Sequence, residues 1–521
     1  MILITSAAYV GPEFQAEFGK LPPAFLPVGN KRLFKFQVAA LSSAFPDEEI
    51  WLSTPESYHL SAQDNHTLQE LEVRTISVPD GLTLADSILF CLNVIETPDK
   101  QIRILHGDTY LPAIPSGDNI LALASTQDYY NWEVESSDTN SESVWCGYFS
   151  FSNIRELIKN LTICRGDFVK AVRMYDQVLM MEKSQSEHWF DLGHINTFYK
   201  TRAKITTQRS FNELTITNTH VYKSGTPGYK ISAEGNWFAN LPVSLKGFVP
   251  QLMGQGFNED RPYYVLEFLY LAPLNELLVN GNNPVFFWRK VFKHLSAWLQ
   301  ACTENFDSQY ISKLNHARQS LFADKTISRL TDFCQKMDFD LTSTVTVNGH
   351  KTPSISQVMD ECIALALSKK PILGILHGDL CFSNILYDSR ADAVKLIDPR
   401  AIDTENNFTM YGDVAYDVAK LNHSLIGLYD HIIAGAYHLE HDGKLNFSLE
   451  ILTDQRIANI QTAYLQEPLV AGLSALEYMP LTILLFLSML PLHADNKPRQ
   501  LALFANAFRL YNEFINSDKN L

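Results

Sequence analysis

The stretch HGDLCFSNILYDSRADAVKLIDPR, residues 377–400, decides how the larger part of this chain folds. It contains two short apolar runs, 385–387 and 394–397, which are separated by polar residues at 388–392. Short runs rich in β-branched and aromatic side chains on either side of a polar turn are typical of a β-hairpin. Such a hairpin returns the chain so that Asp398, after the second run, lies beside the polar residues that precede the first run.

Three polar side chains in this stretch have the spacing of a phosphoryl-transfer site. Asp379 and Asn384 fit the pattern His-x-Asp-x-x-x-x-Asn, in which the carboxylate accepts or orients the attacking hydroxyl group. Asn384 and Asp398 offer an amide oxygen and a carboxylate to a magnesium ion that bridges the nucleotide phosphates. We expect His377 to shape the turn, because Asp379 already serves as the proton acceptor. The stretch therefore predicts phosphoryl transfer from ATP to a hydroxyl group, with Asp379 as the catalytic residue.

The bulk composition describes a large globular protein. The chain has 521 residues, 46% of them hydrophobic and 19% charged, so the length predicts about three domains, or two large ones. Its net charge of −16 disfavours nucleic acid and anionic membrane surfaces as partners, because their phosphates are repelled. The seven cysteines are scattered without a Cys-x-x-Cys pair, which predicts reduced thiols in a cytoplasmic protein.

Two apolar segments raise the question of a membrane or a leader peptide. The chain opens with the apolar residues 1–4 and lacks a basic leader, which predicts a first strand and not a signal peptide. The segment 479–494 is bracketed by Pro480 and Pro491, which leaves fewer residues than the roughly 17 needed to span a bilayer. We therefore expect a buried helix there and no membrane insertion.

A second His-Gly-Asp, at 106–108, belongs to a different kind of site. It follows an apolar run at 102–105, but Ala113 stands where the phosphoryl-transfer pattern needs an asparagine. Upstream, apolar strand patterns at 1–6 and 49–53 alternate with helical patterns. Such alternation predicts a parallel sheet with helices on its faces and ligands at the carboxyl edge of its strands.

Four segments of the first 205 residues form a recognisable set: LPVGNKRL at 26–33, Gly-Asp at 107–108, GYFSF at 147–151 and WFDLGH at 189–194. Through these segments, residues 1–205 resemble the sugar-nucleotidyltransferase family. This resemblance implies a Rossmann-like α/β domain with a mostly parallel sheet. It also implies nucleotidyl transfer, in which a phosphate attacks the α-phosphorus of an NTP and pyrophosphate leaves.

The same resemblance implies that Asp108 and Asp191 bind a metal ion together. The chain departs from the family at its Gly-rich loop and Pro-Lys pair, where it has AYVGP at 8–12 and Pro-Pro at 22–23. Fewer glycines give the backbone fewer ways to wrap a triphosphate, and the missing lysine charge must come from elsewhere, with Lys20 or Lys31 as candidates. Both an active nucleotidyltransferase and a retained fold with lost or altered activity remain open.

Residues 206–521 resemble the aminoglycoside and choline phosphotransferase family, which shares the protein-kinase fold. The resemblance implies an α+β domain of two lobes, a small ATP-binding lobe at 206–272 and a helical lobe at 273–521 with the catalytic loop. Alternating patterns predict strands at 211–217 and 219–223 at the start of the small lobe.

Three residues of the small lobe are candidates for nucleotide binding. Lys223 ends an alternating run and is placed to hold the α- and β-phosphates, with Glu234 as its ion-pair partner. Lys230 is the rival lysine, although it opens a helix. Glu267 lies in the segment 263–269, which is predicted to be the last strand and the hinge that meets the adenine.

The acceptor pocket is expected to come from helices at 286–302 and 355–367, with a hairpin at 345–349 marked by its Asn-Gly turn. Asp413 is predicted to cap the helix that follows it, with a contact to the catalytic loop as the alternative role. Arg400 is a candidate to hold an anionic acceptor or a phosphate, or to pair with Asp413 or Asp417. A quaternary ammonium acceptor would instead need an aromatic cage, for which tyrosines are available at three positions: Tyr411, Tyr416 and Tyr429.

Together the two halves predict a bifunctional enzyme that uses magnesium. One half would phosphorylate a small alcohol, amino alcohol or sugar with ATP, and the other would couple the phosphate to a second NTP. CTP, giving CMP transfer, follows from the small-alcohol interpretation, and the resemblances place such products in bacterial surface polysaccharide. The alternatives are a kinase with a silent partner domain, a non-catalytic nucleotide sensor and, ranked lower without an Asp-x-Asp at Asp108, glycosyl transfer.

Overall fold

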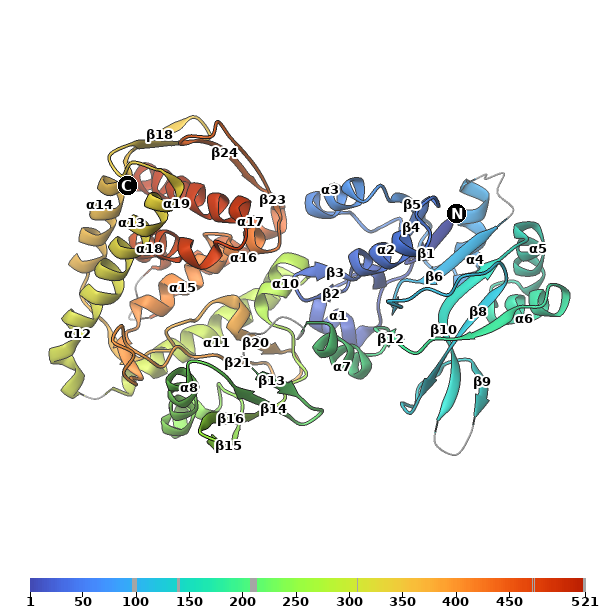
Figure 1. Cartoon of the computed structure of the whole chain (residues 1–521), viewed down its shortest axis with the longest axis horizontal. Helices are drawn as coiled ribbons and strands as arrows, with labels where there is room; N and C mark the ends of the chain where they lie inside the picture. Colours follow the sequence, from blue (N-terminus) through green and yellow to red (C-terminus); the bar gives the residue numbers. More distant parts are fainter. Residues whose placement is uncertain are drawn as a thin grey trace. The chain divides into compact units, whose positions relative to one another are not determined.

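The computed structural model describes residues 1–95, 101–137, 141–206, 213–306, 308–470, 472 and 474–518 (Figure 1). The chain divides into two compact units. Unit 1 comprises residues 1–208 and 280–282, and unit 2 comprises residues 209–279 and 283–521. The junction expected near 206–209 and the first two residues of the strand expected at 211–217 lie largely outside the described residues.

Unit 1 is built on one mixed sheet. Within the described residues this sheet has eight strands in the order β11-β8-β10-β6-β1-β4-β5, with β9 paired to β10. Every strand of the main path is parallel to the others except β10, so the predicted α/β class with a mostly parallel sheet is confirmed. The strands are β1 (Ile2–Thr5), β4 (Ile50–Pro55), β5 (Arg74–Val78), β6 (Ile102–His106), β8 (Ile120–Thr126), β9 (Val134–Ser137), β10 (Glu142–Phe151) and β11 (Glu182–Gln185).

The strand order creates a switch point at the middle of this sheet. The chain runs from β1 outward to β4 and β5 and then returns to place β6 on the other side of β1. In open α/β sheets, ligands bind outside the carboxyl ends of the strands at such a point. β1 and β6 are apolar and buried along nearly their whole length, as expected of strands covered on both faces. Their carboxyl ends deliver Ser6 and Asp108 to the same edge.

Helices and short strands complete unit 1. α4, α5 and α6 pack against one another and bury Ile88, Leu161 and Phe168 in the core under the sheet. β7 pairs with β12, which carries Asp191 to the region of Asp108. The elements are α1 (Pro12–Phe18), β2 (Pro27–Val28), β3 (Lys31–Arg32), α2 (Leu33–Ala44), α3 (Ala62–Glu70), α4 (Leu84–Ile95), β7 (Thr109–Tyr110), α5 (Ile154–Cys164), α6 (Phe168–Val178), β12 (Phe190–Asp191) and α7 (Ile195–Thr206).

Unit 2 opens with a small antiparallel lobe, which fits the predicted α+β kinase-like class. Its four described strands lie in the order β13-β14-β16-β15. The helix α8 packs against β16, with Trp237 fully buried. The elements of this lobe are β13 (Glu213–Ile216), β14 (His220–Ser224), α8 (Gly228–Asn240), α9 (Val243–Lys246), β15 (Leu252–Asn258) and β16 (Arg261–Glu267).

The second lobe of unit 2 is mainly helical. Figure 1 shows α13, α14, α18 and α19 side by side, and the contacts place α18 against each of the other three. The helices are α10 (Leu274–Asn280), α11 (Val285–Glu304), α12 (Ile311–Arg318), α13 (Lys325–Met337), α14 (Ile355–Ser368), α15 (Ala415–Leu425), α16 (Tyr429–Ile433), α17 (Gln455–Leu465), α18 (Met479–Met489) and α19 (Lys497–Asp518).

The apolar segment expected to be a buried helix is α18. Among the described residues, the segment Ala475–His493 is one helical stretch long and apolar enough to cross a membrane, and 72% of it is buried inside the protein. Its side chains, including Ile483 and Phe486, belong to the main core of the lobe. The buried-helix prediction is confirmed.

Short strands frame the helical lobe. The predicted hairpin is present, with positive φ at Asn348 and Gly349 as its tight turn requires. It joins β24 and β23 in a four-stranded sheet that the sequence did not predict. The strands are β17 (Thr344–Val347), β18 (His350–Ser354), β19 (Leu373–Ile375), β20 (Ile385–Asp388), β21 (Ala393–Leu396), β22 (Tyr411–Asp413), β23 (Tyr437–His441) and β24 (Asn446–Ile451).

The prediction that Asp413 caps the following helix was wrong. Asp413 ends the strand β22, and Val414 is the N-cap of α15. The Asp413 carboxylate accepts hydrogen bonds from the backbone N–H groups of Ile372 and Ala415 and pairs with Arg318 at 2.8 Å. Its role is to join β22, α12 and the segment before β19, because a buried carboxylate needs such partners.

Candidate active sites

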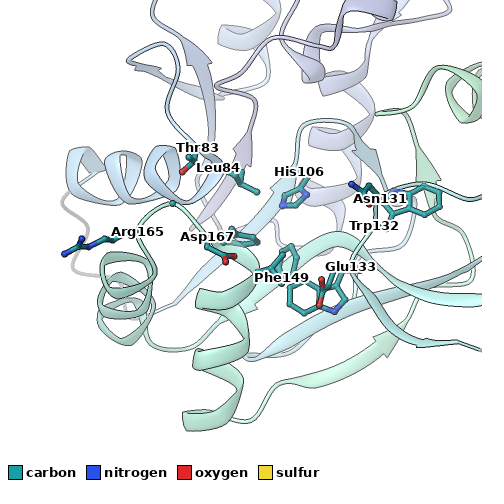
Figure 2. A pocket seen from close by; sticks show the side chains of 13 residues that line it. Thr83, Leu84, His106, Asn131, Trp132, Glu133, Phe149, Arg165 and Asp167 are labelled. Carbon is teal, nitrogen blue, oxygen red and sulfur yellow. The ribbon is translucent and has the colours of Figure 1, made fainter.

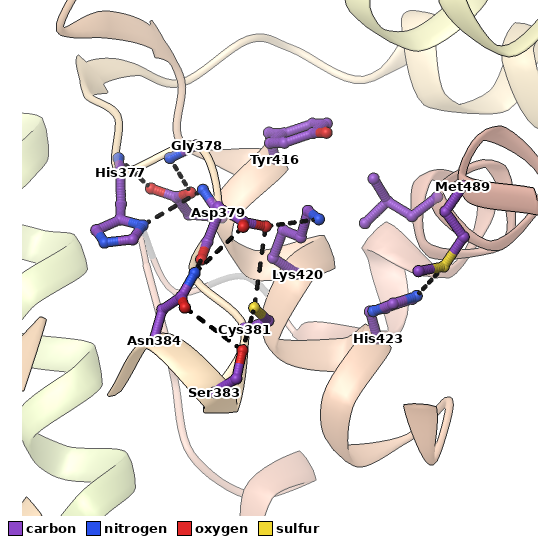
Figure 3. Close-up of polar contacts among 12 residues, drawn as sticks. His377, Gly378, Asp379, Cys381, Ser383, Asn384, Tyr416, Lys420, His423 and Met489 are labelled. Carbon is purple, nitrogen blue, oxygen red and sulfur yellow. Dashed lines mark hydrogen bonds and ion pairs between the residues drawn. The ribbon is translucent and has the colours of Figure 1, made fainter. Parts of the chain in front are cut away.

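The loop between β19 and β20 is held rigidly by one buried carboxylate (Figure 3). Asp417, on α15, accepts the backbone N–H groups of His377 and Gly378, each at 2.8 Å. Gly378 has φ +77°, and a Cβ there would lie 2.8 Å from the Cβ of Arg400, so only glycine fits this turn. The loop contact that the sequence assigned as an alternative role to Asp413 is therefore made by Asp417.

His377 shapes this loop from inside. Its ring bonds the Ile397 carbonyl through Nε2 at 3.0 Å and accepts the Asp379 N–H at Nδ1. Burial lowers the pKa of His377 to about 4, which keeps the ring neutral and fixes the tautomer that this pair of bonds requires. His377 thus ties the loop to the hairpin and carries no proton near neutral pH.

Asp379 points from the loop toward a lysine of α15, as Figure 3 shows. The Nζ of Lys420 lies 2.8 Å from its Oδ1, and the Asp379 side chain remains 42% exposed. Burial by itself raises the pKa of Asp379, but the ammonium of Lys420 outweighs it and lowers the pKa overall. The carboxylate is therefore ionised and accessible, as a proton acceptor must be.

The hairpin returns the chain so that Ile397, the residue before Asp398, lies beside Asn384. β20 pairs with β21, and the N–H of Ile397 donates to the Asn384 carbonyl at 3.0 Å. The Asn384 side chain donates to the backbone oxygen of Asp379 at 2.9 Å and to its Oδ2 at 3.2 Å. Asp398 adopts φ +54°, a left-handed conformation that is uncommon outside glycine and often found at functional sites.

A lysine and a glutamate of the small lobe meet Asp398. The Nζ of Lys223, on β14, lies 2.7 Å from Glu234 of α8 and 3.1 Å from Asp398. Burial by itself lowers the pKa of Lys223, and the two carboxylates reverse the effect and raise it. Lys223, Glu234 and Asp398 form one charged cluster that links the two lobes of unit 2.

Glu267 is placed differently. It ends β16, pairs with His220 of β14, and accepts the Gln251 N–H at 2.9 Å. The N–H of Phe268 donates to the Thr219 carbonyl, so the segment after β16 is tied to the start of β14. Glu267 is not among the residues that line the cavity described below.

We expect Lys223→Met to weaken ATP affinity by at least about tenfold, because it removes the charge-assisted bonds offered to the phosphates. Lys230→Met is the matched control, since Lys230 lines the same cavity but opens α8 rather than ending β14. Equilibrium binding of ATP to both variants checks the assignment. If only Lys230→Met lost affinity for ATP, the phosphate-binding lysine would be Lys230 and not Lys223.

A second expected result concerns the stability of the loop. Asp417→Ala leaves two buried N–H groups without an acceptor, at a cost of roughly 1–3 kcal/mol each, so the free energy of unfolding should fall by about 2–6 kcal/mol. Asp417→Asn keeps one acceptor oxygen and should lose less. Urea unfolding of the three proteins measures the difference, and a loss in Asp417→Ala below about 0.5 kcal/mol, typical of surface sites, would contradict this account.

One cavity of about 610 Å³ is lined by Lys223, Glu234, Asp379 and Asp398, whereas Asn384 is not among its lining residues. The lining also includes Tyr416, one of the tyrosines considered above for an aromatic cage, and three residues that the sequence did not predict: Lys325, Arg329 and Lys420. Lys325 and Arg329 start α13, where no motif marks them. Lys420 is the one residue of α15 that is not fully buried. A cation in so buried a helix needs a partner, which points to a role in the site.

In unit 1, Asp108 and Asp191 lie at the edge predicted for them. The N–H of Leu192 donates to the Asp108 carbonyl at 2.9 Å, and a Cβ on Gly193 would lie 2.5 Å from the Asp108 Oδ2. Burial raises the pKa of Asp108 to about 6, and the neighbouring Asp191 carboxylate adds to the rise. Two like charges held this close favour a cation between them.

Asp191 has several other partners. Its Oδ1 accepts the Gly193 N–H at 3.1 Å, and its Oδ2 lies 2.8 Å from Nδ1 of His194 and also accepts the Thr197 hydroxyl. These contacts fix the orientation of the carboxylate. Burial by itself lowers the pKa of His194, but the hydrogen bond and charge of Asp191, together with the charge of Asp108, raise it overall.

The substituted loop after β1 is already internally bonded. The Ser6 N–H donates to Ser53, and the Ser6 Oγ accepts the Ala24 N–H. Lys20, a candidate for the missing lysine charge, lies with its Nζ 4.0 Å from the ring centre of Tyr9. Lys31, the other candidate, lies over Phe36 at 5.7 Å.

A cavity of about 620 Å³ lies beside the strand that ends in His106 (Figure 2). His106 is at its centre, with Trp132 and Glu133 on one side and Thr83 and Leu84 on another. Burial lowers the pKa of His106 to about 4, so the ring is neutral. The cavity is large enough for a small ligand next to the Asp108 edge.

At either site, a magnesium ion would need ligands from the phosphates of a bound nucleotide as well as from the protein. Among the described residues, no group of three or more His, Cys, Asp or Glu side chains is placed to hold a metal ion. Magnesium is commonly bound through one or two carboxylates together with substrate phosphates and water. Asn384 with Asp398, and Asp108 with Asp191, fit that manner of binding.

Comparisons with known proteins found similarity to solved structures. No family model and no curated protein matches the chain. A solved nucleoside-diphosphate-sugar pyrophosphorylase from Vibrio cholerae RC9 is similar over 39% of this chain and 99% of its own, with 13% identity and a TM-score of 0.33. An aminoglycoside-3'-phosphotransferase of type VIII is similar over 61% of this chain and 99% of its own (14% identity, TM-score 0.29).

A GDP complex of an aminoglycoside 2'-phosphotransferase is similar over 62% of this chain and 99% of its own, with 11% identity and a TM-score of 0.37. The chain thus has structural neighbours among nucleotide-sugar pyrophosphorylases at its N-terminal part and among aminoglycoside phosphotransferases over a larger part, in agreement with the two resemblances read from the sequence.

Proposed function

We propose that the chain is a bifunctional transferase, in which unit 2 phosphorylates a small hydroxyl compound with ATP and unit 1 transfers a nucleotidyl group to the resulting phosphate. The observation that carries the first activity is the single cavity shared by Asp379 and the cluster of Lys223, Glu234 and Asp398. A proton acceptor and a phosphate-binding cation then face the same space. That is the requirement for transfer between two bound substrates.

In the proposed kinase step, Asp379 accepts the proton of the acceptor hydroxyl as the oxygen attacks the γ-phosphorus. The bond between the γ-phosphorus and the bridging oxygen breaks, and ADP leaves. Lys223, held by Glu234, binds the α- and β-phosphates, while Asn384 and Asp398 would hold a magnesium ion. The bound ion would neutralise charge on the phosphates.

In the proposed second step, the new phosphate attacks the α-phosphorus of an NTP and pyrophosphate leaves. Asp108 and Asp191 are the ligands for the ion that this step uses, and the cavity beside His106 is the candidate acceptor site. We propose CTP as the nucleotide and an NDP-activated precursor of bacterial surface polysaccharide as the product. Reduced, buried cysteines suit an enzyme that works in the cytoplasm.

The test measures ADP and pyrophosphate separately while the enzyme is incubated with magnesium, ATP, each NTP and a panel of alcohols. The proposal expects ADP with one class of alcohol, followed by pyrophosphate with one NTP. ADP without pyrophosphate under every NTP would leave a kinase with a silent partner domain. Magnesium-dependent ATP binding without turnover would instead favour a nucleotide sensor and overturn the enzyme.

A further inference from the structure

Besides the lysines that pair with its carboxylates, the cavity beside Asp379 contains four cations that the proposed kinase step does not use: Lys230 of α8, and three further residues described next. Lys325 and Arg329 occupy positions i and i+4 of α13 and therefore share one face of that helix. Arg400 follows Asp398 by two residues, at the turn that Gly378 makes possible. All three line the same cavity as Asp379, and we call them the cationic cluster.

The carboxylates nearest to the proposed reaction already have cationic partners. Glu234 and Asp398 both pair with Lys223, and Asp379 pairs with Lys420. Their charges are therefore balanced without the cationic cluster.

The two remaining carboxylates of the lining are engaged elsewhere. Asp403 accepts the backbone N–H groups of Glu405 and Asn407 within its own turn. Asp324 accepts a hydrogen bond from the side chain of Gln319. In the part of the chain that the structure describes, no ion pair joins Lys325, Arg329 or Arg400 to a carboxylate.

The contacts of the cluster are with neutral oxygens. Lys325 donates to the hydroxyl of Tyr416 at 3.3 Å, and Arg329 donates to the Ser488 carbonyl at 3.2 Å. Burial lowers the pKa of Lys325, and the neighbouring charges of Arg400, Lys420 and Arg329 lower it further.

The same positive charges also change the pKa of Tyr416. Burial would raise its pKa, but Lys325, Lys420 and Arg400 lower it to about 8. Cations gathered in a partly buried cavity repel one another, and an anion among them removes that cost.

Resting on the proposed kinase function, we propose that the acceptor is itself an anion: a small polyol, sugar or hydroxy acid whose carboxylate or phosphate is bound by Lys325, Arg329 and Arg400. Its hydroxyl then reaches Asp379, which lines the same cavity. The new O–P bond forms at that hydroxyl as ADP leaves, so the product carries both the original anionic group and a phosphate.

The same geometry disfavours a quaternary ammonium acceptor. Tyr416, one of the tyrosines considered for an aromatic cage, lies against Lys325 and is surrounded by positive charge. Tyr411 lines a different cavity, together with Tyr310. Arg400 makes no described ion pair with Asp413 or Asp417, which leaves it available for an anionic ligand.

The test compares polyols of increasing length, each as the neutral polyol, its carboxylate and its phosphate, with choline as a cationic member. Binding is measured by calorimetry with the full chain and a non-hydrolysable ATP analogue present, and ADP formation is measured in parallel with ATP. We expect at least one anionic member to bind about tenfold or more tighter than its neutral parent, and choline not to bind. The carboxylate and phosphate arms show which anion is preferred.

Three variants locate the binding site. Lys325→Gln and Arg329→Gln should each weaken the anionic member by about tenfold or more and leave its neutral parent unchanged. Lys336→Gln is the control, because it makes the same change on the same helix at a side chain that is 67% exposed and paired with Asp332. The pKa of Tyr416 should rise from about 8 in Lys325→Gln. Phenolate absorbance measures this pKa, and the Tyr416→Phe variant identifies the signal that belongs to Tyr416.

The outcomes separate this inference from the kinase function. Charge-selective binding without ADP would overturn the kinase and leave the anion site standing. ADP formed equally from neutral or cationic alcohols, and unaffected in Lys325→Gln, would overturn the anionic acceptor and leave the kinase standing. The anionic acceptor would also be overturned if no anionic member bound more tightly than its neutral parent. It would be overturned as well if Lys325→Gln and Arg329→Gln both lost affinity for ATP instead of affinity for the acceptor.

Discussion

Asp379→Asn should lower the rate of ADP formation by about 10²–10⁴-fold, the range that a positioned general base contributes. The amide keeps the shape of the side chain but cannot accept the hydroxyl proton. ATP affinity should change little, because in our proposal Lys223 contacts the phosphates and Asp398 acts on them through the magnesium ion that it would hold. Initial rates of ADP formation and equilibrium ATP binding, measured on the same preparation, check both statements.

Lys420 supplies the necessary control for that variant. Asp379→Asn leaves the Lys420 ammonium without its carboxylate partner, so thermal unfolding must show that the variant is folded. Asp332→Asn, an exposed carboxylate on α13, should keep the rate of the parent protein. If Asp379→Asn retained more than about a tenth of the parent rate while folded, Asp379 would not be the base.

Asp108→Asn should lower pyrophosphate release by about 10²–10³-fold and leave ADP formation unchanged. Metal ligation supplies several kcal/mol of charge stabilisation in such a transfer, and the amide removes one of its two carboxylates. Since burial and Asp191 raise the pKa of Asp108 to about 6, the substitution also relieves a repulsion, and the variant should remain folded. Pyrophosphate and ADP are measured in one reaction.

Asp118→Asn is the matched change at an exposed carboxylate of unit 1, and it should alter neither product. A fall in ADP formation in Asp108→Asn would show that the two activities do not have separate sites. Normal pyrophosphate release in Asp108→Asn would remove Asp108 from the proposed chemistry.

The parts of the sites that the sequence predicted are those determined by local spacing. The Asp379–Asn384 contact is made within one loop, and the hairpin after it returns the chain to Asn384 just before Asp398, so both features follow from the spacing in the sequence. Lys223 and Glu234 are separated by a strand end and one helix, and the pair follows the pattern of the small lobe.

The residues that the sequence did not predict reach the site through long-range packing. Lys325 and Arg329 come from α13, whose place is fixed by contacts with α18 far along the chain. Asp413 is the last residue of the strand β22, whereas Asp417 lies in the first turn of α15, which begins at Ala415. Asp417 and not Asp413 therefore holds the loop. No spacing rule distinguishes those two aspartates.

The fold shows the same division. The buried strands β1 and β6 were predicted from continuous apolar runs, which parallel strands covered on both faces require. β11 was not predicted, because Glu182–Gln185 is a polar sequence held in the sheet only by its pairing with β8. Edge strands of this kind carry little apolar pattern in the sequence.

The central claim is that Asp379 and the charged cluster of Lys223, Glu234 and Asp398 form one kinase site in unit 2. Following the γ-phosphoryl group of ATP tests this claim most directly. Labelled ATP is incubated with magnesium and the acceptor panel, and the label is followed in the parent protein and in Asp379→Asn. The account predicts label in a phosphorylated acceptor with the parent protein and almost none with the variant. Label found only in unreacted ATP or in inorganic phosphate with the parent protein, under every acceptor, would contradict it.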